Sequence, residues 1–500
     1  MTDTSVNTTE AAAPEAAAAA NLRPLRVAVV GAGPAGVYAS DILLKQLAAK
    51  GEELGIGTEA TIDLFEKLPV PFGLVRYGVA PDHPAIKWIM GALEKTLDNP
   101  KIRLFSDVEF GRDVNLDELK ERYDLVLFAT GAVDDRPLTI PGHDLKDVFG
   151  AAHFVEWYDG YPTGPRHWDL AAKSVAVLGG GNVAMDVSRI LVKNADDLLA
   201  TDIPNNVYDD LKNNRIEDLH LFVRRGPAQA KFSVQELREL EKLRGVQIIV
   251  DPKDFEIDDE TLAEAGKDKL TRQMLDELFV VRDMAAKMAA EGGTDFEGNP
   301  ATRRYHFHFF ASPVEILAGD DGKPRAIRVE RTTCAPNGHM TLTGEVEEIP
   351  VGAVYHAIGY KPAQIPGIPY DEARYTLTNE AGRILSAPSA EGGEQIARLY
   401  ATGWAKRGPV GLIGSTKSDA LETVDNILAD LAADANKGRA ATDVDPDSIG
   451  ALLASRGVKP IDYAGWKKVD AFERAEGAKV EREHIKVVDP DQMRAIALGE

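Results

Sequence analysis

The strongest constraint on the fold is an apolar run that leads into a glycine-rich turn and then into a segment of helical periodicity. Residues 25–30 (LRVAVV) are followed by Gly31, Gly33 and Gly36 in the spacing G-x-G-x-x-G. The first glycine permits a tight turn, the second lets the backbone approach a pyrophosphate, and the third lets the helix pack against the strand. The helix start then faces the phosphates with its positive dipole end. The sequence therefore predicts a dinucleotide-binding unit.

An acidic residue ends the next expected strand. Residues 61–66 (TIDLFE) form an apolar run whose last residue, Glu66, is placed to accept a hydrogen bond from a ribose hydroxyl. The interval from Gly36 to Glu66 is 30 residues, where about 20 is usual. The polar insertion KGEELGIGTEA before the strand accounts for the excess.

The same pattern recurs in the middle of the chain. Residues 174–178 (SVAVL) lead into the turn GGGNVA, with alanine in the third glycine position, and the next expected strand is 219–223. This strand is followed by Arg224 and Arg225 rather than by an acid. A carboxylate would repel a ribose 2′-phosphate, whereas two arginines bind it with charge-assisted hydrogen bonds. This unit is therefore expected to prefer NADP over NAD, the alternative being an ordinary pair of surface arginines.

Two such units in one chain predict the α/β class, with two Rossmann-like three-layer dinucleotide-binding domains. The length of 500 residues also favours more than one domain. We expect FAD in the first unit and NADP(H) in the second, the arrangement that hydride transfer to a flavin requires. The only cysteine, Cys334, excludes a disulfide framework, a Cys-x-x-Cys redox centre and a cysteine-ligated iron–sulfur cluster within this chain.

Composition excludes other classes of function. The net charge of −23 argues against nucleic-acid binding, and no run of 18 apolar residues predicts membrane insertion. Residues 1–22 are rich in Ala and Thr and contain no Lys or Arg, so we expect a disordered tail rather than a secretory or mitochondrial signal. With the single cysteine, this indicates the reducing cytoplasm.

Four longer segments carry a family likeness: 71–84 (PFGLVRYGVAPDHP), 223–227 (VRRGP), 232–239 (FSVQELRE) and 403–414 (GWAKRGPVGLIG). Together they closely resemble the adrenodoxin-reductase type of ferredoxin–NADP(+) reductase, from about residue 23 to near the C-terminus. The resemblance implies a glutathione/adrenodoxin-reductase-like fold in which the NADP domain is inserted into the FAD domain. The implied limits are 23–133 and 369–500 for the FAD domain and 134–368 for the NADP domain.

The glycine motifs and the resemblance together imply the residues that hold the cofactors. The implied FAD contacts are Gly31, Gly33, Ala35, Gly36, Glu66, Leu74, Phe110, Trp404, Gly411, Leu412 and Ile413. The implied NADP contacts are Gly180, Gly181, Asn182, Val183, Arg224, Arg225, Glu236 and Gly411. Gly411 belongs to both sets, because a side chain there would separate stacked flavin and nicotinamide rings.

His83 and Glu236 are the candidate catalytic residues. His83 lies between prolines in APDHP, and the resemblance places it near the flavin. The alternative is that it caps a helix that begins near Ala85, or is simply buried. Ser233-x-x-Glu236 matches a capping box, so Glu236 has the alternative role of starting a helix over 234–244. The two roles of Glu236 are compatible.

Two further segments bear on the chemistry. Trp404 is expected beside the flavin, the alternative being an aromatic residue of the core. A helix over 418–432 is expected to present its N-terminus near the flavin. His306 and His308 alternate in YHFHFF and share one face of an expected strand. No third ligand at a known spacing accompanies them, so no metal site is expected.

The expected activity is FAD-mediated hydride transfer from NADPH followed by one-electron transfer to a ferredoxin-type iron–sulfur protein, or the reverse. The alternative is an NADPH-dependent flavoprotein reductase with another acceptor, such as a quinone or a partner subunit. Four cations are candidates for docking an acidic partner, the alternative being a solvated helix face: Arg238, Lys242, Arg244 and Arg407. We expect a monomer. The acceptor, the direction of electron flow and the role of residues 251–300 stay open.

Overall fold

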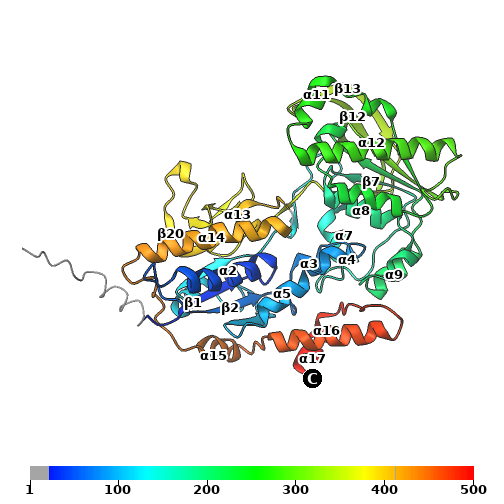
Figure 1. Cartoon of the computed structure of the whole chain (residues 1–500). Coiled ribbons are helices and arrows are strands. Elements are labelled where there is room, and N and C mark those ends of the chain that lie inside the picture. The colour runs from blue at the N-terminus through cyan, green and yellow to red at the C-terminus, as the bar shows by residue number, and fades with distance from the viewer. Residues whose placement is uncertain (1–21, 412) are drawn as a thin grey trace, which may run out of the picture.

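The fold is built around two large β-sheets, each covered by helices (Figure 1). The computed structural model describes residues 22–411 and 413–500. The expected tail lies outside the described residues except for its last residue, and so does Leu412.

The first sheet has seven strands in the order β18-β19-β20-β4-β1-β2-β3. Strand β1, in the interior of this sheet, is buried along its whole length and pairs in parallel with β2 and β4. Val27 of β1 lies opposite Ile62 on one side and Leu125 on the other. The strands are β1 (Leu25–Val30), β2 (Ala60–Glu66), β3 (Ile102–Ser106), β4 (Leu125–Phe128), β18 (Asn379–Glu380), β19 (Arg383–Leu385) and β20 (Gln395–Ala401).

Helices from both ends of the chain cover this sheet. Helices α2 (Pro34–Lys50) and α14 (Ile413–Ala433) lie side by side over it (Figure 1), and their apolar residues share one core with β1. Leu47 of α2 and Val424 of α14 are both fully buried in that core. The other helices of this part are α3 (Leu74–Tyr77), α4 (Pro84–Lys87), α5 (Met90–Leu97), α6 (Leu116–Arg122), α13 (Trp404–Arg407), α15 (Ser448–Ser455), α16 (Tyr463–Ala478) and α17 (Pro490–Leu498).

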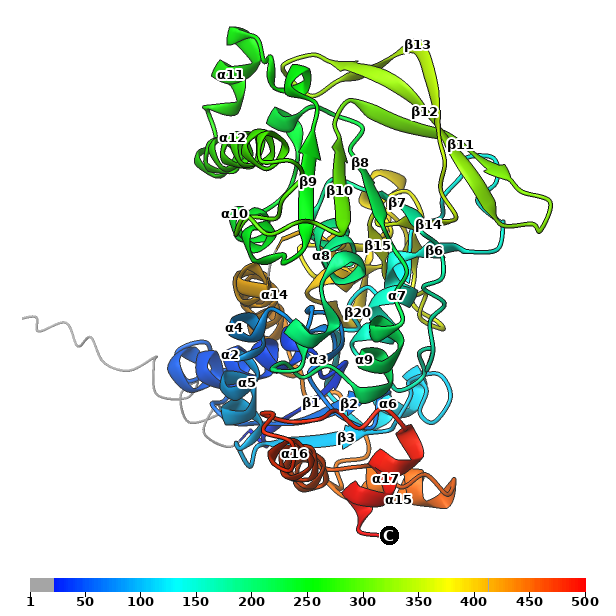
Figure 2. The ribbon, with the colours of Figure 1, turned by 90° about the vertical axis from the view of Figure 1, so that its right-hand side faces the viewer.

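The second sheet has six parallel strands in the order β6-β14-β7-β8-β10-β9 (Figure 2). The strands are β6 (Val148–Gly150), β7 (Ser174–Leu178), β8 (Asp218–Phe222), β9 (Val246–Val250), β10 (Arg303–His308) and β14 (Ala353–His356). Leu219 and Tyr305 pack with helix residues on one face. Phe222 packs on the other face against an antiparallel sheet of three strands, β11 (Ala311–Ala318), β12 (Pro324–Cys334) and β13 (Met340–Ile349).

Six helices accompany the second sheet: α7 (Ala151–Tyr158), α8 (Asn182–Val192), α9 (Asn205–Lys212), α10 (Val234–Arg238), α11 (Asp259–Ala265) and α12 (Lys269–Ala290). Helices α11 and α12 occupy most of the polar segment 251–300, which the sequence left without a role. Met274 and Leu278 of α12 are buried in the core beneath β9 and β10. The segment is therefore a packed outer layer of the second sheet.

The chain passes between the sheets at one place. β5 (Asp134–Asp135) leads out of the first sheet, β15 (Tyr360–Lys361) leads back, and the two pair antiparallel with Asp135 opposite Tyr360. Strands of the first sheet therefore come from residues 25–128 and 379–401, and those of the second from 148–308 and 353–356. The chain also forms the short hairpin β16 (Tyr370–Asp371) and β17 (Thr376–Leu377) after its return.

Two expected helices differ in length. The segment 234–244 is helical only to Arg238 and continues as a 3₁₀ turn to Lys242, because Gly245 follows with φ +71° and turns the chain into β9. The helix expected over 418–432 begins five residues earlier, at Ile413.

The capping box at Ser233 is only half formed. The Ser233 hydroxyl accepts from the Glu236 N–H at 3.3 Å, as expected. The Ser233 N–H donates to Oδ1 of Asn182 at 2.8 Å instead of to Glu236. The Glu236 carboxylate is thereby left to other partners.

No helix in residues 22–411 or 413–500 is long and apolar enough to cross a membrane.

Candidate active site

The first glycine turn has the shape that a bound pyrophosphate requires. Gly31 sits at φ +111° with its α-carbon against the backbone carbonyl of Ala129, where no side chain would fit. Gly36 packs equally closely against the Gly31 carbonyl and so fixes helix α2 on the strand. A β-carbon added at Gly33 would meet nothing within 4 Å. Open space therefore lies at the one glycine whose expected role is to admit a phosphate.

Glu66 lies at the end of β2, beside this turn. Its Oε2 accepts from the Ala32 N–H at 2.9 Å and its Oε1 from the Leu68 N–H at 3.0 Å. The side chain is 7% exposed, and burial raises the pKa of its carboxyl. Because each carboxylate oxygen can accept a second hydrogen bond, Glu66 is held in place and can still accept from a ribose hydroxyl.

After the second sheet, the chain returns to the first glycine turn and packs against it at Gly403. Gly403 packs so closely on Ala35 that an added β-carbon would lie 2.6 Å from the Ala35 Cβ. Trp404 and Leu74 are partly exposed there, as a cofactor neighbour would be. Phe110 is also partly exposed and packs edge-on against Phe128, with ring centroids 5.3 Å apart.

The segment after Trp404 is described only in part. Gly411 adopts φ +84°, and an added β-carbon there would run into the Ser415 side chain. Leu412 lies outside the described residues, and so does the side chain of Ile413.

The second glycine turn is organised in the same way and bound to a neighbouring loop. Gly180 accepts through its carbonyl from the Lys231 N–H at 2.9 Å, and Asn182 accepts from Ser233. An added β-carbon would meet nothing within 4 Å at Gly181. Val183, in the first turn of α8, is partly exposed. This turn is therefore open at its second glycine as well.

Arg224 and Arg225 follow β8, which ends at Phe222. Their backbone is fixed, because the Arg224 carbonyl accepts from Thr332 Oγ1 at 2.7 Å and the Arg225 carbonyl from the Phe310 N–H at 3.1 Å. Arg224 is exposed and Arg225 half-buried. Within the described part of the chain, neither guanidinium makes a hydrogen bond or an ion pair. Two free cations on a fixed backbone suit an anionic ligand.

A buried cluster of charged side chains joins the two halves of the molecule. Nε2 of His83 lies 3.2 Å from Oδ1 of Asp186, 3.2 Å from Oε2 of Glu236 and 2.7 Å from Nη2 of Arg189. His83 comes from the loop before α4, Asp186 and Arg189 from α8, and Glu236 from α10. The two residues expected to be catalytic, His83 and Glu236, are therefore neighbours.

Arg189 is the centre of this cluster. It is fully buried, and its Nη1 donates to Oε2 of Glu236 at 2.7 Å and its Nη2 to Asp186 at 2.5 Å. Its Nε donates to Oδ2 of Asp82 at 2.6 Å, and Lys193 donates to the same oxygen at 2.8 Å. Asp82, Asp186, Arg189 and Lys193 were not among the residues expected from the sequence. An available signal was the pair of charges one turn apart on the helix that follows a glycine turn.

The cluster sets the protonation of His83. Burial and the neighbouring Arg189 cation oppose a charge on the ring, but the hydrogen bonds to Asp186 and Glu236 outweigh both and raise the pKa of His83 to about 9. Burial raises the pKa of Asp186, whereas His83 and Arg189 overcome burial and lower the pKa of Glu236. With His83 protonated, three cations face three carboxylates, so the charges in this buried region balance.

The cations considered for docking are engaged within the molecule. Arg238 pairs with Glu277 at 3.0 Å, Lys242 with Glu239 at 2.7 Å, and Arg244 with Asp197. Arg407 lies 3.4 Å from Asp419. These pairs support the alternative of a solvated, internally neutralised surface.

The residues present fit the two expected cofactors. Each glycine turn is open where a pyrophosphate would lie. Glu66 lies beside the first turn, and Arg224 and Arg225 follow strand β8 of the second unit. The family described as "Pyridine nucleotide-disulphide oxidoreductase" matches residues 25–270. Fold and site therefore define a pyridine-nucleotide oxidoreductase built on two nucleotide-binding sheets.

Two named relatives and one solved structure narrow this class. NADPH-ferredoxin reductase FprA from Mycobacterium tuberculosis is 38% identical over 492 residues, covering 96% of this chain and 100% of that protein. Human mitochondrial NADPH:adrenodoxin oxidoreductase is 37% identical over 476 residues, covering 94% and 91%. The structure of M. tuberculosis FprA in complex with NADPH is similar with a TM-score of 0.84 and 36% identity, covering 95% and 100%. The chain belongs to the family of NADPH-ferredoxin and NADPH:adrenodoxin reductases, which confirms the resemblance and the expected fold class.

Proposed function

We propose that this protein is a ferredoxin–NADP(+) reductase that carries FAD in its first nucleotide site and binds NADP(H) in its second. The main observation behind this proposal is that the first nucleotide site has an acidic residue where the second has two arginines. Glu66 ends β2 beside the first glycine turn, whereas Arg224 and Arg225 follow β8 beside the second. When bound, FAD accepts a hydride from the nicotinamide and releases electrons to an acceptor.

The FAD site is assigned to residues from both ends of the chain. Gly31, Gly33 and Gly36 shape the turn, Glu66 accepts from the ribose, and Ala35 fixes the loop at Gly403. The remaining assigned contacts are Leu74, Phe110, Trp404, Gly411, Leu412 and Ile413. The matching domain limits, 23–133 with 369–500 and 134–368, are supported by the origin of the strands in each sheet.

The NADP(H) site is assigned to the second turn and the arginine pair. Gly180, Gly181, Asn182 and Val183 face the pyrophosphate, with the start of α8 supplying free N–H groups. The remaining assigned contacts are Arg224 and Arg225 for the 2′-phosphate, and Glu236 and Gly411 for the nicotinamide end. The free guanidiniums support NADP over NAD as the ligand.

His83 and Glu236 act where the two sites meet. His83 holds a proton at Nε2 between two carboxylates, and Glu236 stays ionised because Arg189 and His83 surround it. Between the two nucleotide sites, Glu236 supplies a fixed negative charge and His83 a fixed hydrogen-bond donor. These fixed groups would orient the reacting rings, and their burial keeps water away. Both residues are about 4% exposed, so this environment does not depend on bulk solvent.

The electron acceptor is proposed to be a ferredoxin-type iron–sulfur protein, since the relatives are named for ferredoxin and adrenodoxin. The internally paired cations at Arg238, Lys242 and Arg244 predict weak electrostatic attraction. Docking is therefore expected to depend less on salt than a strongly steered complex would. The cytoplasmic location and the monomeric state stay predictions.

The acceptor is tested by anaerobic turnover with NADPH and a two-iron ferredoxin, with a soluble quinone in a parallel reaction. We expect ferredoxin reduction to saturate at micromolar ferredoxin and quinone reduction to stay below it at equal concentration. Flavin reduction by NADPH without ferredoxin reduction would contradict the ferredoxin assignment. Saturable quinone reduction in that case would support the other class of acceptor.

A further inference from the structure

Four polar side chains gather on the face of the second sheet that turns away from helices α8, α10 and α12. Strands β8 and β10 are parallel neighbours, with His220 directly opposite His306. Because side chains alternate along a strand, Asp218 shares a face with His220, and His308 shares a face with His306. The sequence offered no third ligand for His306 and His308, and the neighbouring strand supplies it.

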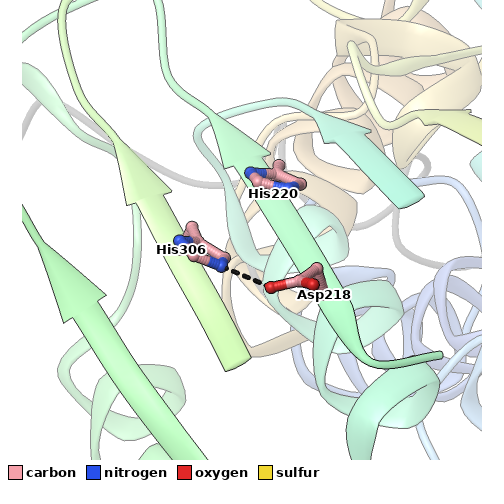
Figure 3. A group of neighbouring side chains, drawn as sticks. All are labelled: Asp218, His220 and His306. Atoms are coloured by element: carbon pink, nitrogen blue, oxygen red, sulfur yellow. Dashed lines mark hydrogen bonds and ion pairs between the residues drawn. The ribbon is translucent and has the colours of Figure 1, made fainter. Parts of the chain in front are cut away.

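Three of these side chains, Asp218, His220 and His306, are close neighbours on strands β8 and β10 (Figure 3). One ring nitrogen each of His220 and His306 and a carboxylate oxygen of Asp218 lie within 4.8 Å of one another. Nε2 of His306 already lies 2.8 Å from Oδ1 of Asp218. Ligand atoms bound to zinc at about 2.0–2.2 Å stand roughly 3.4 Å apart in a tetrahedron. The His220 and His306 rings are stacked, with centroids 4.5 Å apart and an interplanar angle of 14°, so these partly exposed side chains rotate before both ring nitrogens point at one ion.

An outer layer orients these groups. Nδ1 of His220 lies 2.9 Å from Nε2 of His308, which leaves the other ring nitrogen of His220 available. Arg304 donates through Nε to Oδ1 of Asp218 at 2.5 Å and through Nη2 to Oδ2. Such partners for the ligating imidazole and carboxylate are typical of metal sites.

We propose that Asp218, His220 and His306 form a binding site for one divalent transition-metal ion of the zinc class, separate from the two nucleotide sites. Two imidazoles and one carboxylate suit zinc and its neighbours in the first transition series rather than magnesium or calcium, which prefer oxygen ligands. Three protein ligands leave a fourth position for water. The positive charge of Arg304 opposes the ion, so the expected affinity is micromolar rather than nanomolar.

A bound ion would clamp β8 to β10 two residues before β8 ends. The clamp lies on the strand that leads directly into Arg224 and Arg225. Its expected effect is on stability, since an ion that binds only the folded state raises the melting temperature with concentration. The nucleotide sites hold none of the three ligands, so flavin reduction by NADPH is expected to be unchanged.

The test uses tag-free, FAD-loaded protein that has been treated with a chelator and titrated with zinc chloride by calorimetry. Variants His220→Asn and His306→Gln remove one ligand each, and His339→Gln is the matched control because His339 is an exposed histidine outside the cluster. We expect one zinc per chain at micromolar concentration in the wild type and the control. Binding should weaken at least tenfold in each ligand variant, while flavin content and reduction by NADPH stay unchanged.

Zinc-edge anomalous diffraction from wild-type crystals gives an independent reading. A single peak between His220, His306 and Asp218 is the expected result, and magnesium chloride should give no heat of binding. A wild type that takes up no zinc at 100 micromolar would overturn the proposal. So would equal binding by the ligand variants, or a peak elsewhere, and the diffraction result decides even if a variant fails to fold.

Discussion

Nη1 of Arg189 lies 2.7 Å from Oε2 of Glu236, while Nε of the same guanidinium reaches Asp82. Arg189 belongs to helix α8, Glu236 to helix α10, and Asp82 to the loop before α4. The buried Arg189 side chain of α8 therefore connects the loop before α4 to helix α10, beside the second nucleotide site. The contact explains why His83 and Glu236, 153 residues apart, meet in one cluster.

Arg189→Met is expected to destabilise the protein strongly. The change leaves three carboxylates in a buried region without their central cation, and breaking a buried ion pair in this way costs about 3–5 kcal/mol. The measurement is the midpoint of urea unfolding of the FAD-loaded protein. Arg112→Met is the control, since Arg112 forms a surface pair with Asp113 and is 61% exposed, and it should change stability by about 0–1 kcal/mol. Equal shifts for both variants would contradict the account of the cluster.

His83→Gln is expected to slow flavin reduction by NADPH while leaving FAD bound. The variant keeps a hydrogen-bonding side chain but loses the proton shared with Asp186 and Glu236. Loss of one charged hydrogen bond, roughly 1.5–3 kcal/mol, corresponds to about 10- to 100-fold in rate. Stopped-flow absorbance measures it, with His167→Gln as an exposed-histidine control. An unchanged rate in His83→Gln would remove His83 from the active site.

The raised pKa of His83 predicts how stability depends on pH. The ring titrates near 6.5 when unfolded and at about 9 when folded, so the folded state binds the proton more tightly. Its stabilising effect is complete below pH 6.5 and is lost as pH rises through 9, up to about 3 kcal/mol. Melting temperatures of wild type and His83→Gln should therefore converge between pH 7 and pH 10. A difference that stays constant over that range would refute the assigned pKa.

Arg225→Gln, alone or with Arg224→Gln, is expected to reduce the preference for NADPH over NADH. The free guanidiniums are assigned to the 2′-phosphate, which NADH lacks. Each lost charged contact should raise KM for NADPH by about 10- to 100-fold and leave KM for NADH unchanged. Arg238→Gln, which removes a surface arginine paired with Glu277, serves as control. If KM rises equally for both nucleotides, the arginines serve the structure rather than the phosphate.

Local patterns predicted the parts of the fold that depend on local sequence. The strands before both glycine turns have the expected limits, 25–30 and 174–178, because apolar runs and glycine punctuation determine them. The helix after Ser233 was expected to be longer, since the turn at Gly245 competes with helical periodicity. The family likeness added the expectation that the second unit is inserted into the first, which no local pattern contains.

Spacing could have indicated the Asp186–Arg189 pair within α8, but not the cluster as a whole. Asp82, Arg189 and Glu236 come from three separate elements, and only the packing of α8 between them brings their side chains together. The same holds for His220 and His306, which are far apart in sequence but directly opposite in a parallel sheet. Which strands lie next to one another in a parallel sheet cannot be predicted from a local sequence pattern.

The most direct test of the central claim is anaerobic stopped-flow mixing of the purified protein with NADPH and, separately, with NADH. We expect the protein to carry FAD, and we expect NADPH to bleach the flavin absorbance at least tenfold faster than NADH at equal concentration. Protein that is colourless and takes up no added FAD would contradict the account, and so would flavin that neither nucleotide reduces.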